Sequence, residues 1–173
     1  MTLTFANLDA QRRAGGAVIS IFIWAMVAAV VAARLLNGGG LIGLSIAAVF
    51  VAAVATFALR WRGGSPTGRA LSGVAVRAQV SLLVAAMGGF PWQIDMHMAY
   101  FAALALLVVY CDWVVIAAAA ATVAVHHLGV SYLLPSAVFP GSASLGRVIV
   151  HAVILIVEAG ALIAVTASVN SMF

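Results

Sequence analysis

The sequence predicts an all-α, polytopic membrane protein built as a bundle of six transmembrane helices. Of its 173 residues, 66% are apolar and only 7% are charged, whereas soluble domains have about 25% charged residues. The apolar residues fall into runs of about 20, the length that crosses a bilayer as a helix. These runs lack the alternation of a membrane β-barrel. Helices also satisfy their backbone hydrogen bonds internally, as the hydrocarbon core requires.

Glycine, proline and charged residues mark where the apolar runs end. We expect a cytoplasmic N-terminal segment, residues 1–14, followed by a single transmembrane domain over residues 15–170. Its helices are predicted at about 15–36, 41–59, 71–88, 92–110, 113–134 and 147–170. Glycines at 38–40 end the first helix, a polar loop at 63–69 follows the second, and Gly88 to Pro91 end the third. The pair Cys111-Asp112 makes a tight turn into the fifth, and a longer loop with Pro135 and Pro140 precedes the sixth.

The arginines predict the orientation. All eight basic residues are arginine, and they flank apolar runs instead of forming the exposed basic face of a nucleic-acid-binding protein. Arg12 and Arg13 lie before the first helix, and Arg60, Arg62 and Arg69 lie after the second. The positive-inside rule therefore puts both termini in the cytoplasm. Arg77, within the third helix, is expected to extend its side chain back toward the cytoplasmic surface.

The four histidines fall at a similar depth in this topology. His97 lies early in the fourth helix, His126 and His127 lie late in the fifth, and His151 lies early in the sixth. At 1.5 Å per residue, each is roughly 6–10 Å below the outer boundary. Ionisable groups inside a membrane are costly and suggest a function. Neutral imidazole, which an apolar setting favours, is a ligand for zinc and copper. The sequence therefore predicts a transition-metal site near the outer face, with copper or zinc favoured.

The sequence leaves open which other side chains belong to this site. Adjacent residues diverge by about 100° around a helix, so His126 and His127 cannot easily bind one ion, and the sequence does not choose between them. Asp95 is a candidate to orient a histidine of a neighbouring helix. Glu158 is on the same face as His151 but about 10 Å deeper, which suits a second ion, a proton relay or a polar partner. The single cysteine, Cys111, excludes an intramolecular disulfide and a cysteine-only metal site.

Part of the chain resembles a known family. The segments that carry the resemblance are Pro91-Trp92-Gln93-Ile94-Asp95-Met96-His97-Met98-Ala99-Tyr100-Phe101, His126-His127, Leu133-Leu134-Pro135, Ala137-Val138-Phe139-Pro140 and His151-Ala152-Val153. Together they are similar to the N-terminal membrane region of certain bacterial methyl-accepting chemotaxis proteins and related signalling proteins, over about residues 88–160. The resemblance implies a sensory input module in the bacterial inner membrane, a homodimer, and a cytoplasmic output domain in the full-length protein. It also implies that the four histidines belong to the sensory site.

Three other functions stay open at this stage. Two axial histidines from different helices would suffice to bind haem b in a membrane sensor. A metal-activated water with Glu158 or Asp95 as base would make a membrane enzyme, although the sequence contains no recognisable catalytic motif. Glu158 and His151 would suit a proton or ion pathway in a transporter. The leading hypothesis is a metal-binding chemoreceptor-like sensor that is not an enzyme.

Overall fold

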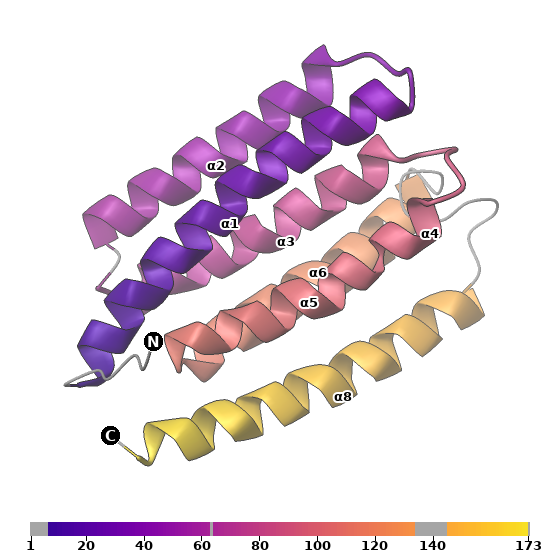
Figure 1. Cartoon of the computed structure of the whole chain (residues 1–173). Coiled ribbons are helices and arrows are strands. Elements are labelled where there is room, and N and C mark those ends of the chain that lie inside the picture. Colours follow the sequence, from indigo (N-terminus) through magenta and orange to yellow (C-terminus); the bar gives the residue numbers. More distant parts are fainter. Residues whose placement is uncertain (1–6, 63, 134–144, 173) are drawn as a thin grey trace.

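The computed structural model of the chain describes residues 7–62, 64–133 and 145–172. These residues form helices and contain no strand, and six helical stretches are long and apolar enough to cross a membrane (Figure 1). The elements are α1 (Leu8–Leu36), α2 (Ile42–Arg62), α3 (Pro66–Ala86), α4 (Gln93–Met96), α5 (Met98–Leu106), the 3-10 helix η1 (Leu107–Tyr110), α6 (Trp113–Leu133) and α8 (Leu145–Asn170). The predicted all-α fold class is confirmed, and the six apolar helices are those of a multi-pass membrane protein.

α3 is the central helix of the bundle. It packs against α1, α2, α6 and the α4–α5 segment, and 61% of its most apolar window is buried, against 11% for α8. α1 and α2 lie on one side of this centre, and α8 lies on the other side along α6 (Figure 1). α8 is therefore a peripheral helix, attached to the bundle chiefly through α6.

Two helices begin earlier than the sequence predicted because polar residues cap them. The side chain of Asn7 accepts a hydrogen bond from the Ala10 amide at 2.9 Å, so α1 begins at Leu8 instead of near residue 15. Ser65 caps α3 in the same way through the Gly68 amide, with Pro66 in the first turn. Part of the polar loop expected at 63–69 is therefore helical. The loop expected before the sixth helix lies mostly outside the described residues.

The fourth span is not the continuous helix expected over 92–110. It consists of α4, α5 and η1, which together make one membrane-length stretch from Gln93 to Tyr110. The break between α4 and α5 is at His97. His97 keeps a helical backbone conformation at this break, with φ of −63° and ψ of −26°. The sequence pattern did not indicate the break. The span therefore changes its local geometry at a residue predicted to be functional.

Glycine permits the closest helix contacts. A Cβ added at Gly15 on α1 would lie 3.0 Å from the backbone oxygen of Val109 in η1. One added at Gly73 on α3 would lie 2.9 Å from a methyl group of Val115 on α6. Without the hydrophobic effect to associate them, membrane helices depend on close contact at small residues. Gly15 and Gly73 therefore bring α1 and α3 against the second half of the bundle.

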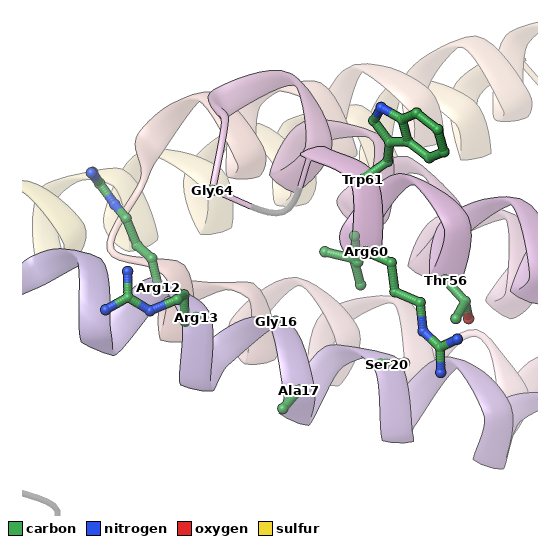
Figure 2. A pocket seen from close by; sticks show the side chains of 10 residues that line it. Arg12, Arg13, Gly16, Ala17, Ser20, Thr56, Arg60, Trp61 and Gly64 are labelled. Carbon is green, nitrogen blue, oxygen red and sulfur yellow. The ribbon is translucent and has the colours of Figure 1, made fainter.

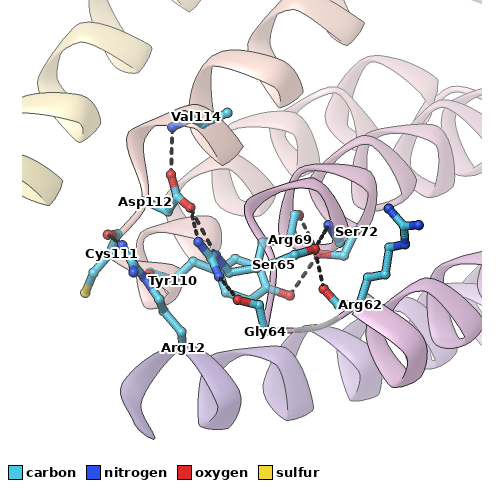
Figure 3. A network of polar contacts seen from close by, with 11 residues as sticks. Arg12, Arg62, Gly64, Ser65, Arg69, Ser72, Tyr110, Cys111, Asp112 and Val114 are labelled. Atoms are coloured by element: carbon cyan, nitrogen blue, oxygen red, sulfur yellow. Dashed lines mark hydrogen bonds and ion pairs between the residues drawn. The ribbon is translucent and has the colours of Figure 1, made fainter. Parts of the chain in front are cut away.

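A polar network holds together the end of the bundle where α1 begins and α8 ends (Figure 3). Asp112, before α6, accepts hydrogen bonds from the buried Arg69 at 2.7 and 3.0 Å and from the Val114 amide at 3.1 Å. Arg12 donates to the backbone oxygens of Tyr110 and Cys111, both at 3.3 Å. Asp112 thus caps α6 and also joins α6 to α3.

Cys111 adopts a left-handed backbone conformation in this turn, with φ of 47°. Burial raises the pKa of its thiol, although the nearby Arg12 opposes this shift. A thiol kept protonated is a weak nucleophile. Cys111 is a buried residue of the turn between η1 and α6.

Candidate functional site

Three histidines from three separate spans meet near the opposite end of the bundle. We call His97, His127 and His151 the histidine cluster. The ring centroid of His97 is 6.2 Å from that of His127 and 6.2 Å from that of His151. The rings of His127 and His151 stack with centroids 5.8 Å apart. The histidines predicted to share a layer therefore also converge in the plane of that layer.

Backbone carbonyls orient two members of the cluster. The Nδ1 atom of His97 is 3.0 Å from the Gln93 oxygen, and that of His127 is 3.0 Å from the Val123 oxygen. A carbonyl oxygen only accepts, so both Nδ1 atoms carry the proton and donate it. In the neutral form of each ring, the unprotonated nitrogen is then Nε2. This is the arrangement in which metal-ligating histidines are usually held.

The cluster surrounds a small cavity. The cavity has a volume of about 30 Å³, and its polar lining residues are His97, Tyr100, His127, His151 and Glu158. About 10–15 Å³ is the minimum for one water molecule, so the cavity has the size of a single ion or a few waters. His97 and His127 are 8% and 5% exposed, which keeps bulk solvent away from these imidazoles.

The rings are slightly too far apart to hold an ion in this conformation. With metal–nitrogen distances of about 2.0–2.1 Å, tetrahedral ligands place imidazole centroids roughly 5 Å apart. The observed separations are 5.8–6.2 Å. Accordingly, no group of three His, Cys, Asp or Glu side chains in the described part of the chain stands ready to hold a metal ion. Each pair of rings would have to approach by roughly 1 Å.

The structure distinguishes the two adjacent histidines on α6. His127 lines the cavity with His97 and His151. The ring of His126 lies instead beside Tyr100 and His127, at centroid distances of 6.4 and 5.6 Å, and it does not line the cavity. Its Nε2 atom has no hydrogen-bond partner among the described residues. The sequence did not choose between His126 and His127, and the geometry favours His127 as the α6 histidine of the site.

The carboxylates occupy different places from those expected. Glu158 lines the same cavity as His151, although it lies seven residues further along α8. Its Oε2 atom has no hydrogen-bond partner within the described ranges. Asp95 is exposed and does not line the cavity. The backbone oxygens of Gln93 and Val123 orient the histidines, which is the role we expected of Asp95.

A buried arginine adjoins the cluster, and its predicted direction was wrong. The side chain of Arg77 does not reach the surface of the bundle. It is 0% exposed, its Nη1 donates to the backbone oxygen of Tyr100, and its Cζ lies 5.9 Å from the centre of the Tyr100 ring. A buried charge requires polar partners, and the contacts of Arg77 with Tyr100 lie inside the bundle. Its Nε and Nη2 atoms have no hydrogen-bond partner among the described residues.

Tyr100 connects this arginine to the histidines. Its hydroxyl forms a 2.9 Å hydrogen bond with Ser81, which also donates to the Arg77 backbone oxygen at 3.0 Å. Its ring lies 5.3 Å from that of His127 and 6.0 Å from that of His97. Sequence reasoning missed the roles of Tyr100 and Ser81. The available signals were the charge of Arg77 inside an apolar run and the position of Tyr100 one turn after His97.

The methionines beside His97 are outside the cavity. Met96 packs against the hydrophobic core, and Met98 is 64% exposed. The potential donors around the cavity are therefore imidazoles and a carboxylate, which suit zinc and copper(II).

The chain matches no family model, no curated protein and no solved structure. The resemblance to the chemoreceptor membrane region stays a prediction.

Proposed function

We propose that this protein is a membrane-embedded sensory module that binds a transition metal ion, zinc or copper, through His97, His127 and His151. The observation that carries the proposal is the convergence of three imidazoles from three spans on one ion-sized cavity. Glu158 supplies a carboxylate at the same cavity and is a candidate for the fourth ligand. Three histidines and an acidic or water ligand are a common zinc-binding set.

Metal binding would move α8. The ion draws the rings together by roughly 1 Å, and His151 is the member carried by the peripheral helix. An apolar cavity of about 160 Å³ lies between α6 and α8 and reaches His127 and His151, so α8 has room to approach. The ion then binds the contracted arrangement more tightly than the open one, which is the condition for a ligand to shift a conformational equilibrium.

The displaced helix would carry the signal to the other end of the bundle. α8 begins near the cluster and ends at the same end of the bundle as the start of α1 (Figure 1). Arginines gather at that end on α1, α2 and α3, which supports a cytoplasmic position for both termini in the bacterial inner membrane. A cytoplasmic output domain after α8 would receive the movement, and a homodimer is the assembly that the resemblance implies.

Haem b is a weaker alternative. The cavities that touch the histidine cluster have volumes of about 30 and 160 Å³, whereas organic ligands and cofactors occupy about 300–1,000 Å³. No feature of the site specifically favours an enzyme or a transporter.

Elemental analysis and a visible spectrum of the purified chain test the proposal. We expect zinc or copper near one equivalent per chain and no Soret band. His151→Ala should weaken metal binding by about 100-fold, because it removes the ligand on α8. Unchanged metal affinity in His151→Ala would refute the proposal, and a Soret band would indicate haem in place of the metal ion.

A further inference from the structure

A second cavity lies far from the histidine cluster, between the beginning of α1 and the end of α2. It has a volume of about 430 Å³, within the range of ligand-binding pockets. Three arginines line it: Arg12 and Arg13 from α1, and Arg60 from α2. Figure 2 shows the two α1 arginines toward one end of the cavity and Arg60 toward the other.

Among the described residues, no acidic residue lines this cavity. The acidic residue nearest to it along α1 is Asp9, one turn before Arg12 and Arg13. In the described part of the chain the ion pair that forms is Arg69–Asp112, so none of the three arginines has a carboxylate within 4 Å. Cations gathered around one space repel each other, and an anion in that space relieves the repulsion.

Arg12 lines this cavity and is held in place by the protein. Its Nε and Nη2 atoms donate to the Tyr110 and Cys111 oxygens, which fixes the guanidinium group against the turn before α6. A guanidinium group has five N–H donors, so further donors remain. Arginine recognises phosphate oxygens through charge-assisted hydrogen bonds. Fixing the donor before binding reduces the entropy lost on association.

The surroundings favour a lipid over a soluble anion. Trp61 also lines the cavity, is 76% exposed and lies with its ring 5.3 Å from that of Phe57, which is 62% exposed. Tryptophan at a helix end is typical of the membrane–water interface. The aromatic pair offers an apolar surface beside the charged cavity, suited to the glycerol and upper acyl chains of a phospholipid. Basic pockets between transmembrane helices are a known form of anionic headgroup site.

We propose that the cavity between α1 and α2 binds the headgroup of an anionic phospholipid, with Arg12 and Arg13 at one end of the cavity and Arg60 at the other. This site is independent of the histidine cluster and of any metal.

Native mass spectrometry of the full chain, titrated with phosphatidylglycerol or phosphatidylcholine, tests the assignment. We expect preferential retention of phosphatidylglycerol. Arg60→Gln should weaken that retention about fivefold, the effect of one basic residue at an anionic surface. Arg62→Gln is the matched control, because it removes the same charge from the same last turn of α2 but does not line the cavity. Arg60→Lys, which keeps the charge, should retain most of the binding. Arg13→Gln, which also removes a charge that lines the cavity, replaces Arg60→Gln if that variant does not fold.

Three outcomes would overturn the assignment. Equal retention of the two lipids would show that the cavity does not select an anion. Equal losses in Arg60→Gln and Arg62→Gln would show general attraction to a basic surface. Displacement of the lipid by inorganic phosphate, beyond that caused by chloride at the same ionic strength, would identify a soluble phosphate compound as the occupant.

Discussion

The two adjacent histidines of α6 provide a sharp test of the metal site. His127→Ala removes a ring that lines the cavity, whereas His126→Ala removes its neighbour, which does not. Structural zinc sites contribute about 10–16 kcal/mol through about four ligands, or about 3 kcal/mol for each ligand. The loss of one ligand should therefore weaken metal binding by about 100-fold. His126→Ala should leave the affinity within about threefold of the parent chain, well below the loss of one ligand.

Competition with a chromophoric chelator, in detergent or nanodiscs, would measure both affinities for zinc and for copper. Helicity and the midpoint of thermal unfolding should be compared in parallel, because His127 is 5% exposed and its removal leaves a void. His127→Gln retains more of the volume and should show the same loss of affinity. Equal losses from the two alanine variants, or unchanged binding in both His127 variants, would refute the placement of His127 as a ligand at the cavity.

Three further predictions concern the surrounding structure. Glu158→Gln should weaken metal binding about 10- to 100-fold, measured by the same competition, and Asp95→Asn, outside the cavity, should not; the reverse order would contradict the placement of the carboxylates. Asp112→Asn should destabilise the protein by about 3–5 kcal/mol, because it leaves Arg69 buried without its ion partner. Thermal unfolding in detergent would measure this loss, with Asp9→Asn, which alters an exposed carboxylate, as the control. Gly15→Ala should destabilise the protein by about 1–3 kcal/mol through contact with the Val109 oxygen. Gly160→Ala, with no atom within 4 Å, should be neutral or stabilising in the same assay. Equal effects of the two substitutions would show that the close approach of α1 to η1 does not constrain residue 15.

The sequence predicted several features because they depend on local properties. Hydropathy over about 20 residues identifies a membrane-crossing helix without knowledge of its neighbours. Most boundaries were predicted closely, and the main errors arose where Asn7 and Ser65 cap the helices earlier. The shared depth of the histidines also followed from local quantities, namely the rise per residue and the alternating direction of the spans.

The lateral arrangement of the helices was decided only by the tertiary structure. Each helix can rotate about its axis, and a step of one residue turns a side chain by about 100°. The sequence therefore could not choose between His126 and His127, or direct Arg77 toward Tyr100. Packing of α3 and α6 at the centre fixes these rotations. It brings His97, His127, His151 and Glu158 to one cavity and leaves Asp95 outside it, because the side chains that meet are determined by contacts between helices far apart in the chain.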